Sequence, residues 1–550
     1  MEKKTLNLNC LSAKDTILLN KIAWREKNRY TEYVDECCRK YGDNYLFWAT
    51  PFSSRNIFND NTFMHICHIC LVKELIGFGG SDYDRIITGS KCEYLVLKGI
   101  LPPIVSLEYM GASRIDSARL FFDRVKSAIV YFAHHICYVI HSPKENDICS
   151  EQSAIVIGFA VSSDFEGYHY NERYMPGIDS YHDVVFLPQV INNSSKPFKC
   201  LLNQMKNCTN VSFLYNRKLA RISDLWEIVR YWLFTSKIQN KRFDYAGIDI
   251  SPIIKESMAC GKTSGPSLDG LMMRKILYRL SKLKGNIKNF ILWYEGRSLD
   301  VMNSASIHEF FPEANCVGYE GYPLTEIGLS EFVSDYQYHS GHSPSVIAVP
   351  SEAYGSEAHQ FCRDIPLIYA PLLRNQYTLQ SPATKSRIVR KILIVLPYYI
   401  WNAKEILDCV DEYVRASGTD SIIMIKNHPI YSEMTVEDYG CTNLSFAPEY
   451  VSGNLNDCLA DVDIAIASMT SSSLEVLFSG TPLIIMVPRG QFGFTSLPEK
   501  VRNQMCSIVY DAVELSNAID QIMDYGDFDN STLEDLLVPK TRENVMCLFI

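Results

Sequence analysis

Three short apolar runs near the C-terminus form the most regular pattern in the chain. They are rich in β-branched residues, lie between turn residues, and cover 422–425, 462–467 and 483–487. Runs of this length and composition are typical of strands buried on both faces of a parallel sheet. The segment from Ser471 to Phe478 has helical composition and stops at Gly480, before Pro482. The alternation predicts an α/β domain with a doubly wound sheet.

Polar residues follow two of these predicted strands. In doubly wound sheets, ligands bind at the carboxyl ends of strands. A helix N-terminus with hydroxyl side chains suits a phosphate group, and an imidazole on a neighbouring loop can donate a hydrogen bond to it. The alternative is a simple helix cap beside a loop histidine. The nucleotide-binding residues that we predict are Lys426, His428, Pro429, Ser471, Ser472, Ser473 and Glu475.

Two acidic residues follow predicted strands further upstream. The run from Asn289 to Trp293 leads into Tyr294, Glu295, Gly296 and Arg297, and a second run leads into Glu320. An α/β enzyme places a catalytic carboxylate at such a position. Glu295 is therefore the candidate general base, with Glu320 as its rival, although an ion pair of Glu295 with Arg297 is an alternative.

Arg55 is a candidate for contact with an anionic sugar or a phosphate. It follows the strand-like run Tyr45-Leu-Phe-Trp48 and the residues Ser53 and Ser54. A surface salt bridge is the alternative role. With Glu320 and Arg297, it completes the residues that we expect on the acceptor or sugar side.

These motifs together resemble those of bacterial GT-B glycosyltransferases that build surface polysaccharides such as O-antigen and capsule. The resemblance rests on Lys426-Asn-His-Pro429, the serine cluster and Gly480-Thr-Pro482, which are similar to the motifs of polysialyltransferases and Kdo transferases. Further segments that carry it are 48–55, 292–296 and 349–356.

The resemblance implies two Rossmann-like α/β domains that face a central cleft. It implies transfer of an acidic sugar, sialic-acid-like or Kdo, from a CMP-activated donor to a surface glycan or a lipid-linked glycan. His428 would stabilise the leaving phosphate without a metal ion, and no cofactor beyond the donor is implied. The related enzymes carry an acidic-acidic-Gly motif whose second acid is the base. Glu295 matches that acid, whereas Tyr294 departs from the first.

Two other functions fit the same residues. One keeps the fold and uses a UDP- or GDP-sugar or a CDP-alditol. The other is a non-catalytic assembly protein of GT-B shape, for which the Tyr294 departure is mild support.

The predicted domain organisation follows from the spacing of the elements. We predict an N-terminal acceptor-side α/β domain over 1–375 with a helical hairpin inserted near 117–140. A polar linker follows over 376–390, then a nucleotide-sugar-binding domain over 391–530 and a tail over 531–550. We expect the last residues to cross back to the N-terminal domain.

Composition and charge exclude several classes of protein. The chain of 550 residues has a net charge of −10, which argues against a general nucleic-acid binder. Its 18 cysteines follow no regular spacing, and the start of the sequence lacks the pattern of a signal peptide. No run has the length of a membrane span. We therefore expect a cytoplasmic protein with reduced thiols, with peripheral association with the inner membrane as an alternative.

One cluster of metal-binding residue types stands out in the predicted helix 62–77. It contains His65, Cys67, His68 and Cys70. A zinc site needs a second ligand pair at suitable spacing, and the sequence that follows has none. We therefore predict no metal site there.

Overall fold

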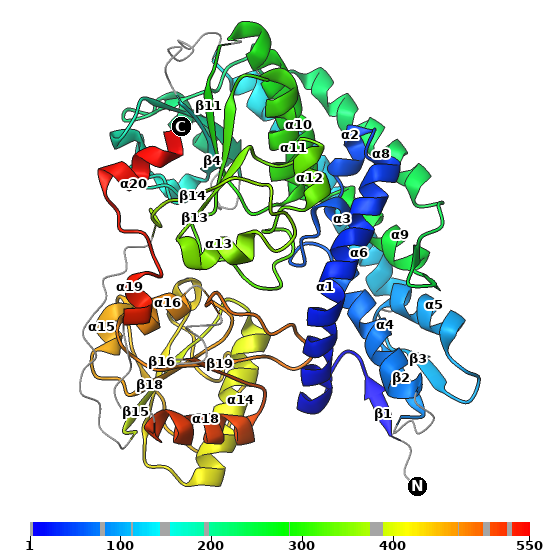
Figure 1. Ribbon diagram of the computed structural model, residues 1–550, viewed down its shortest axis with the longest axis vertical. Coiled ribbons are helices and arrows are strands. Elements are labelled where there is room, and N and C mark those ends of the chain that lie inside the picture. The colour runs from blue at the N-terminus through cyan, green and yellow to red at the C-terminus, as the bar shows by residue number, and fades with distance from the viewer. Residues whose placement is uncertain are drawn as a thin grey trace.

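The computed structural model shows two regions stacked one above the other (Figure 1). It describes residues 4–77, 83–111, 114–143, 154–191, 197–284, 286–374, 389–470, 472–498, 506–524 and 531–549. Each region is built on a parallel sheet with helices packed against it. The predicted α/β architecture is therefore confirmed by the sheets themselves.

The upper region contains a seven-stranded sheet in which all the described strand pairs are parallel. Its strands, in spatial order, are β14 (Leu367–Tyr369), β13 (Val346–Val349), β12 (Asn315–Tyr319), β11 (Asn289–Trp293), β4 (Ala154–Ala160), β7 (Val184–Val190) and β8 (Ser212–Phe213). The central strands β4 and β11 are almost entirely buried, as their continuous apolar sequences predict. Helices α10 (Gly265–Leu283) and α11 (Ser298–Phe310) pack against each other beside this sheet.

The lower region contains a six-stranded parallel sheet. Its strands, in spatial order, are β17 (Glu449–Tyr450), β16 (Ile422–Lys426), β15 (Lys391–Val395), β18 (Ile464–Ala467), β19 (Leu483–Met486) and β20 (Cys506–Val509). Numbered along the chain, this order is 3-2-1-4-5-6, the order of a Rossmann domain. Helices α14 (Ile400–Ser417) and α18 (Ala512–Asp524) pack against each other on this domain. Residues 376–388, most of the predicted linker, lie outside the described residues.

The first 111 residues contain a further small sheet that the sequence analysis did not predict. It is parallel and three-stranded, with β1 (Thr5–Asn7), β2 (Arg85–Thr88) and β3 (Ser106–Tyr109). Around it lie α1 (Ala13–Tyr41), α4 (Thr62–Gly77) and α5 (Lys91–Ile100).

Two apolar runs in this part are helices, and one of them is a predicted strand. Tyr45–Trp48, predicted as a strand, is α2, whose first turn Asn44 caps by accepting the N–H of Leu46 at 3.1 Å. The apolar run at 94–97 belongs to α5, and Ser90 Oγ caps this helix by accepting the N–H of Glu93. Both runs are short and apolar, and such runs do not distinguish a strand from a buried helix.

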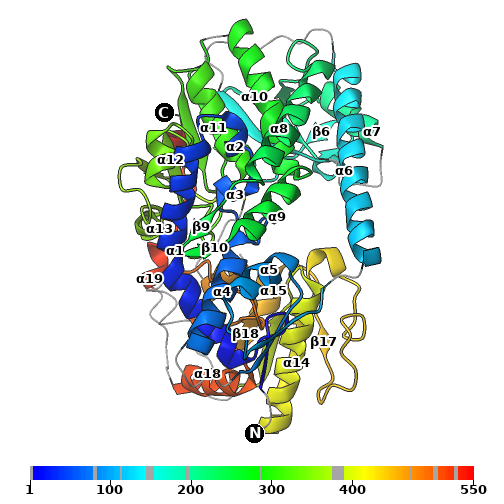
Figure 2. The same ribbon diagram turned by 90° about the vertical axis from the view of Figure 1, so that its right-hand side faces the viewer.

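Helix α6 (Arg114–His141) replaces the predicted helical hairpin with one continuous element. It lies on the outer side of the upper region (Figure 2). Within the part of the chain that the structure describes, no helix is both long enough and apolar enough to span a bilayer.

Helix α1 joins the two regions. It runs alongside both of them (Figure 1) and holds the loop that follows β19. Asn20 donates from Nδ2 to the carbonyl of Gln491 at 3.1 Å and accepts the N–H of Gly493 at Oδ1. Thr16 Oγ1 accepts the N–H of Gly490 at 2.9 Å. Each pair links side chains of the first helix to backbone more than 470 positions away.

Buried apolar residues from both large sheets form one continuous cluster, which we call the interdomain cluster. Its upper members follow β11, β12 and β13 and its lower members come from β15, β18, α16 (Ser472–Phe478) and β19; they include Tyr294, Leu324, Tyr354, Leu393, Leu474 and Leu497. Tyr354, on α13 (Glu352–Ala358), also donates to the carbonyl of Ser496 at 2.9 Å.

The last described residues return to the upper sheet. Val538 donates its N–H to the carbonyl of Pro350 at 2.9 Å, and Val545 and Leu548 are buried in the core of the upper region. Figure 1 shows α19 (Ser531–Glu534) beside the lower domain and α20 (Arg542–Met546) beside the upper one. The chain therefore crosses between the regions twice.

The contact between α1 and the 490–493 loop predicts a stability effect. Asn20→Ala leaves the N–H of Gly493 and the carbonyl of Gln491 buried without these partners, so the free energy of unfolding should fall by about 1–3 kcal/mol. Asn240→Ala removes one exposed contact, to the carbonyl of Ser236, and should change it by less than about 0.5 kcal/mol. Denaturant unfolding of both variants measures the difference, and equal effects would contradict the role of Asn20.

Candidate functional site

In the lower sheet, the order in which successive strands are added reverses between β15 and β18. In a doubly wound sheet, this switch point is where a ligand binds outside the carboxyl ends of the strands. Tyr398 and Tyr399 follow β15, and Ser468 follows β18. Asn402 Nδ2 donates to Ser468 Oγ at 2.8 Å and so ties the start of α14 to the end of β18.

His428 lies beside this switch point, at the end of β16. Its Nδ1 accepts the N–H of Ile430 at 3.3 Å, which leaves Nε2–H as a donor in the neutral ring. Its ring centroid lies 5.4 Å from that of Tyr398. Burial lowers the pKa of His428, so the imidazole is expected to be neutral near pH 7 and to act as a hydrogen-bond donor.

The predicted placement of His428 and the serine cluster on neighbouring loops is corrected by the order of the strands. Strand β15 pairs with both β16 and β18 and separates them. The residues after β15, above all Tyr398 and Tyr399, therefore lie between the two predicted motifs. Sequence order alone hides this, because β15 precedes both strands in the chain.

The helix predicted at the serine motif is present as α16. Ser471 lies outside the described residues, and α16 begins at Ser472 and has 7 residues. So short a helix provides only a weak dipole. Ser473 is buried, and its Oγ makes no hydrogen bond within the described residues.

The remaining predicted nucleotide-binding residues, Lys426, Pro429 and Glu475, lie within a few positions of His428 or the serine cluster in the sequence. Lys426 Nζ donates to the carbonyl of Gly453 at 2.6 Å. Pro429 opens the short 3-10 helix Pro429–Tyr431 directly after His428. Burial raises the pKa of Glu475, with Lys426 acting in the opposite direction.

Glu295 lies at the corresponding edge of the upper sheet, just after β11. Its Oε1 accepts from Trp293 Nε1 at 2.7 Å, its other oxygen forms an ion pair with Arg297, and 29% of its side chain is exposed. The predicted ion pair is thus present, and the carboxylate still reaches solvent. The Arg297 guanidinium also lies 5.3 Å from the ring centroid of Phe159, at the end of the adjacent strand β4.

The turn after Glu295 depends on Gly296. Its φ is 62°, and a Cβ there would lie 1.6 Å from the carbonyl oxygen of Ser330. Ser330 Oγ also donates to the carbonyl of Glu295 at 3.0 Å. The chain of residues 324–333 therefore packs directly against the turn that holds the candidate base.

Asp300 supports this turn from within. Its Oδ2 accepts the N–H groups of Arg297 at 3.0 Å and Glu295 at 3.2 Å at the start of α11. Burial raises its pKa to about 7, against the lowering effect of Arg297. Asp300 is not among the residues predicted from the sequence, although an acid three residues into a helix after a Gly-containing turn is a capping signal.

Glu320 and Glu331 add two buried carboxyl groups. Glu320 follows β12, and its carboxylate oxygens make no hydrogen bond within the described residues; burial raises its pKa well above the usual value. Glu331 accepts from Thr325 N at 2.7 Å and from Thr325 Oγ1 at 2.9 Å, and burial raises its pKa to about 8. Such perturbed groups are frequent at functional sites. Glu331 lies in a loop without a motif, so no local pattern in the sequence indicates it.

Arg55 and Tyr294 are buried rather than exposed at the edge. Arg55 follows helix α3 (Pro51–Ser54), not a strand, is 2% exposed, and donates to the carbonyl of Phe332 at 2.9 Å and to Gln337 Oε1. Contact of Arg55 with a sugar would require the segment that contains Phe332 and Gln337 to move away from it. Tyr294, which replaces the first acid of the resembling motif, belongs to the interdomain cluster.

An apolar cavity of about 220 Å³ lies elsewhere in the upper region. Its lining includes Tyr131 and His134 of α6, Gln189 at the carboxyl end of β7, and Met272 of α10. None of the predicted site residues lines it, so the cavity and the polar strand edges are separate features.

Gly296→Ala tests the close approach of the turn at Gly296 to the backbone of Ser330 beside the candidate base. The substitution should lower the free energy of unfolding by about 1–2 kcal/mol because the backbone is left-handed there. The clash of the added Cβ with Ser330 should lower it further. Gly167→Ala is the matched control, because Gly167 has φ 64° and no atom within 4 Å of the added Cβ. Denaturant unfolding should show a clearly larger loss for Gly296→Ala; an equal loss would contradict the contact.

Asp300→Asn tests the buried carboxyl through the pH dependence of stability. The folded carboxyl keeps its proton up to about pH 7, whereas the unfolded one loses it near its usual value of about 4. Its stabilising contribution is therefore complete below pH 4 and is lost as the pH rises toward 7, at up to about 1.4 kcal/mol per pH unit. The variant should show a flatter profile in unfolding experiments between pH 4 and 7. Parallel profiles would contradict the raised pKa.

The comparisons with known proteins give weak structural likenesses alone. No protein-family description matches the chain, and no curated protein does. One similar solved structure is the UDP-GlcNAc 2-epimerase of Methanocaldococcus jannaschii in complex with UDP-GlcNAc and UDP (TM-score 0.39, 10% identity, 72% of this chain and 98% of that chain). Others are the glycosyltransferase of kitacinnamycin (0.36, 11%, 72% and 95%) and the spinosyn rhamnosyltransferase SpnG complexed with thymidine diphosphate (0.32, 11%, 72% and 95%). These likenesses carry no argument, and the two-domain α/β fold rests on the parallel sheets.

Proposed function

We propose that this protein is a glycosyltransferase of the GT-B type, which binds a nucleotide-sugar donor on its lower domain and a glycan acceptor on its upper domain. The observation that supports this most is the position of the polar residues. Glu295 and His428 each follow a parallel strand at a carboxyl edge, and residues that follow strands of both sheets join in the interdomain cluster. Substrates bound at the two edges would meet near this boundary.

The donor in this proposal is a CMP-activated acidic sugar, of the sialic-acid-like or Kdo type. Support comes from the sequence resemblance around His428 and Pro429. A UDP- or GDP-sugar or a CDP-alditol is the competing choice, because the same fold and the same residues fit these donors. The acceptor is a surface glycan or a lipid-linked glycan.

Glu295 is the general base in the proposed reaction. Its carboxylate takes the proton of an acceptor hydroxyl, whose oxygen attacks the anomeric carbon while the bond to the donor phosphate breaks. Glu295 fits this role better than Glu320, because its side chain is 29% exposed and Trp293 and Arg297 orient it. Glu320 is 1% exposed, which would keep it from an acceptor hydroxyl.

His428 acts on the leaving nucleotide in this proposal. The Nε2–H that faces away from its bond with Ile430 donates to a phosphate oxygen as negative charge develops there. Tyr398, exposed beside it, offers a ring face for a base or a sugar. Lys426 contributes positive charge from the end of the same strand as His428.

Calorimetric titration with CMP, UDP, thymidine diphosphate and GDP tests the donor. CMP should bind most tightly, and His428→Ala should weaken its binding roughly 10- to 100-fold, the effect of one hydrogen bond to a charged group. His339→Ala, at an exposed histidine 3.2 Å from Asp364, is the control and should leave binding unchanged. Preference for UDP or thymidine diphosphate would overturn the CMP donor, and binding of none would favour a non-catalytic protein.

Steady-state kinetics with a donor that binds tests the base. Glu295→Gln should lower kcat by about 10²- to 10⁴-fold and leave nucleotide affinity unchanged. Glu320→Gln should lower kcat far less, because the group is buried away from solvent. A full rate in Glu295→Gln together with a large loss in Glu320→Gln would move the base to Glu320.

A further inference from the structure

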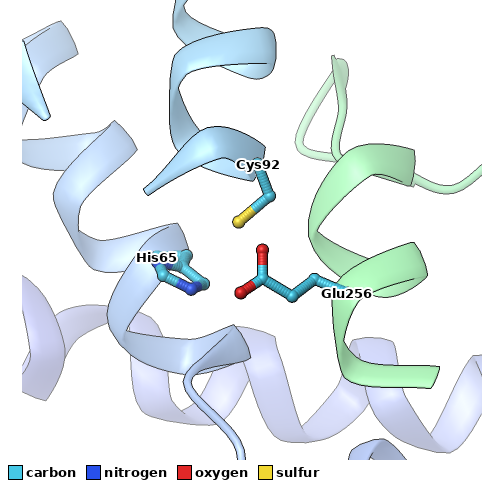
Figure 3. Close-up of side chains that lie close together, drawn as sticks. All are labelled: His65, Cys92 and Glu256. Atoms are coloured by element: carbon cyan, nitrogen blue, oxygen red, sulfur yellow. The ribbon is translucent and has the colours of Figure 1, made fainter. Parts of the chain in front are cut away.

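Three side chains from distant parts of the sequence converge between helices of the N-terminal part. They are His65 of α4, Cys92 of α5 and Glu256 of α9 (Ser251–Gly261). One ligand-type atom of each lies within 4.8 Å of the others. Figure 3 shows the three side chains pointing toward one another from their separate helices.

From this geometry we infer that His65, Cys92 and Glu256 form a binding site for a divalent transition-metal ion of the zinc class. Imidazole, thiolate and carboxylate are the donor types that Zn²⁺ takes. Bond lengths of about 2.0–2.3 Å hold ligand atoms of a tetrahedral site somewhat closer together than 4.8 Å, so small side-chain shifts would complete the site. Three protein ligands leave a fourth position for water.

A second observation, outside the three ligands, supports the site. Glu93 is buried, and its Oε1 lies 2.7 Å from Nδ1 of His65. With Nδ1 donating to this carboxylate, Nε2 of His65 remains as the nitrogen for a metal ion. A carboxylate on the far nitrogen of a ligating histidine is the usual support of such sites, since it fixes the tautomer and the ring orientation.

The buried carboxylate is itself held in place. Thr88 Oγ1 donates to Glu93 Oε2 at 2.5 Å, and His68 Nδ1 lies 2.7 Å from Oε1. Glu93 is therefore fixed by three side chains and cannot swing away from His65 without breaking these contacts. This rigidity favours a preformed site.

The proposed site differs from the expectation that the sequence supports, namely no metal site in this region. Within the 62–77 helix, the sequence offers no second ligand pair at suitable spacing. The structure brings His65 together with Cys92 and Glu256, which lie 27 and 191 positions later in the chain. Ligands spread in this way leave no spacing motif.

The metal ion would have a structural role. Helices α4, α5 and α9 pack against one another, and the ion would link all three. Phe63, two residues before His65, packs against Phe492 of the lower domain with ring centroids 5.3 Å apart. The site would therefore stiffen the surface on which the loop after β19 rests.

The competing explanation is a protonated His65 that bonds to Cys92 and Glu256 without any metal. A bound metal ion and a protonated His65 would each place a positive charge beside Cys92 and Glu256. The two states differ in whether the thiolate of Cys92 binds a metal ion, which a spectrum can detect.

Titration of the chelator-treated full-length protein with Co²⁺ tests the inference. A thiolate-to-cobalt charge-transfer band should rise and saturate at one equivalent, and Zn²⁺ should displace it. Cys92→Ser should abolish the band, and Glu256→Gln, at an exposed position, should weaken Zn²⁺ binding by at least roughly 10-fold in competition with a chromogenic chelator. Cys70→Ser, on the same helix as His65 but outside the group, should leave both unchanged.

Two results would overturn the site. One is the absence of a saturable band in the wild-type protein, which would favour the protonated histidine. The other is a band that persists in Cys92→Ser or an affinity that is unchanged in Glu256→Gln. Because Glu256 lies at the surface, its variant keeps the test decisive even if Cys92→Ser fails to fold. Thermal unfolding provides the independent check, since the same Zn²⁺ concentration should raise the Tm of the wild type more than that of Glu256→Gln.

Discussion

Parallel strand pairing is the constraint on which the rest of this structure depends. In both large sheets the described strands run in one direction, so every polar segment that follows a strand reaches the same edge of its sheet. Glu295 and Glu320 follow adjacent strands of the upper sheet, and His428 lies one strand from the switch point of the lower one. The interdomain cluster contains buried residues from both regions. Apolar strands thus bring together residues that are more than 100 positions apart in the chain.

Carboxyl groups buried beside the upper edge are the main electrostatic feature. Asp300, Glu320 and Glu331 all have raised pKa values because burial disfavours their charged forms. Arg55 is buried within the same part of the molecule, where it donates to the carbonyl of Phe332. Unpaired buried charge is costly, so these acids hold protons at a pH where exposed acids do not. Glu295, ion-paired and partly exposed, is the acid of this edge best placed to meet a substrate.

The sequence predicted the lower sheet well and the N-terminal part poorly. The three apolar, β-branched runs at 422–425, 462–467 and 483–487 are all strands, at Ile422–Lys426, Ile464–Ala467 and Leu483–Met486. Tyr45–Trp48 has a similar apolar character, yet local capping by Asn44 makes it a helix. The candidate residues after strands were found because strand ends have signals. Glu331, the separation of β16 from β18 by β15, and the burial of Arg55 depend on packing between distant segments, which no local pattern encodes.

Amide hydrogen exchange with and without a bound nucleotide tests the central claim most directly, namely that the two strand edges form one site. The account predicts that nucleotide slows exchange in the segments after β15, β16 and β18, and that a complete donor also slows it in the turn at residues 294–297. Protection confined to the apolar cavity between α6 and α10, or absent from both strand edges, would contradict it.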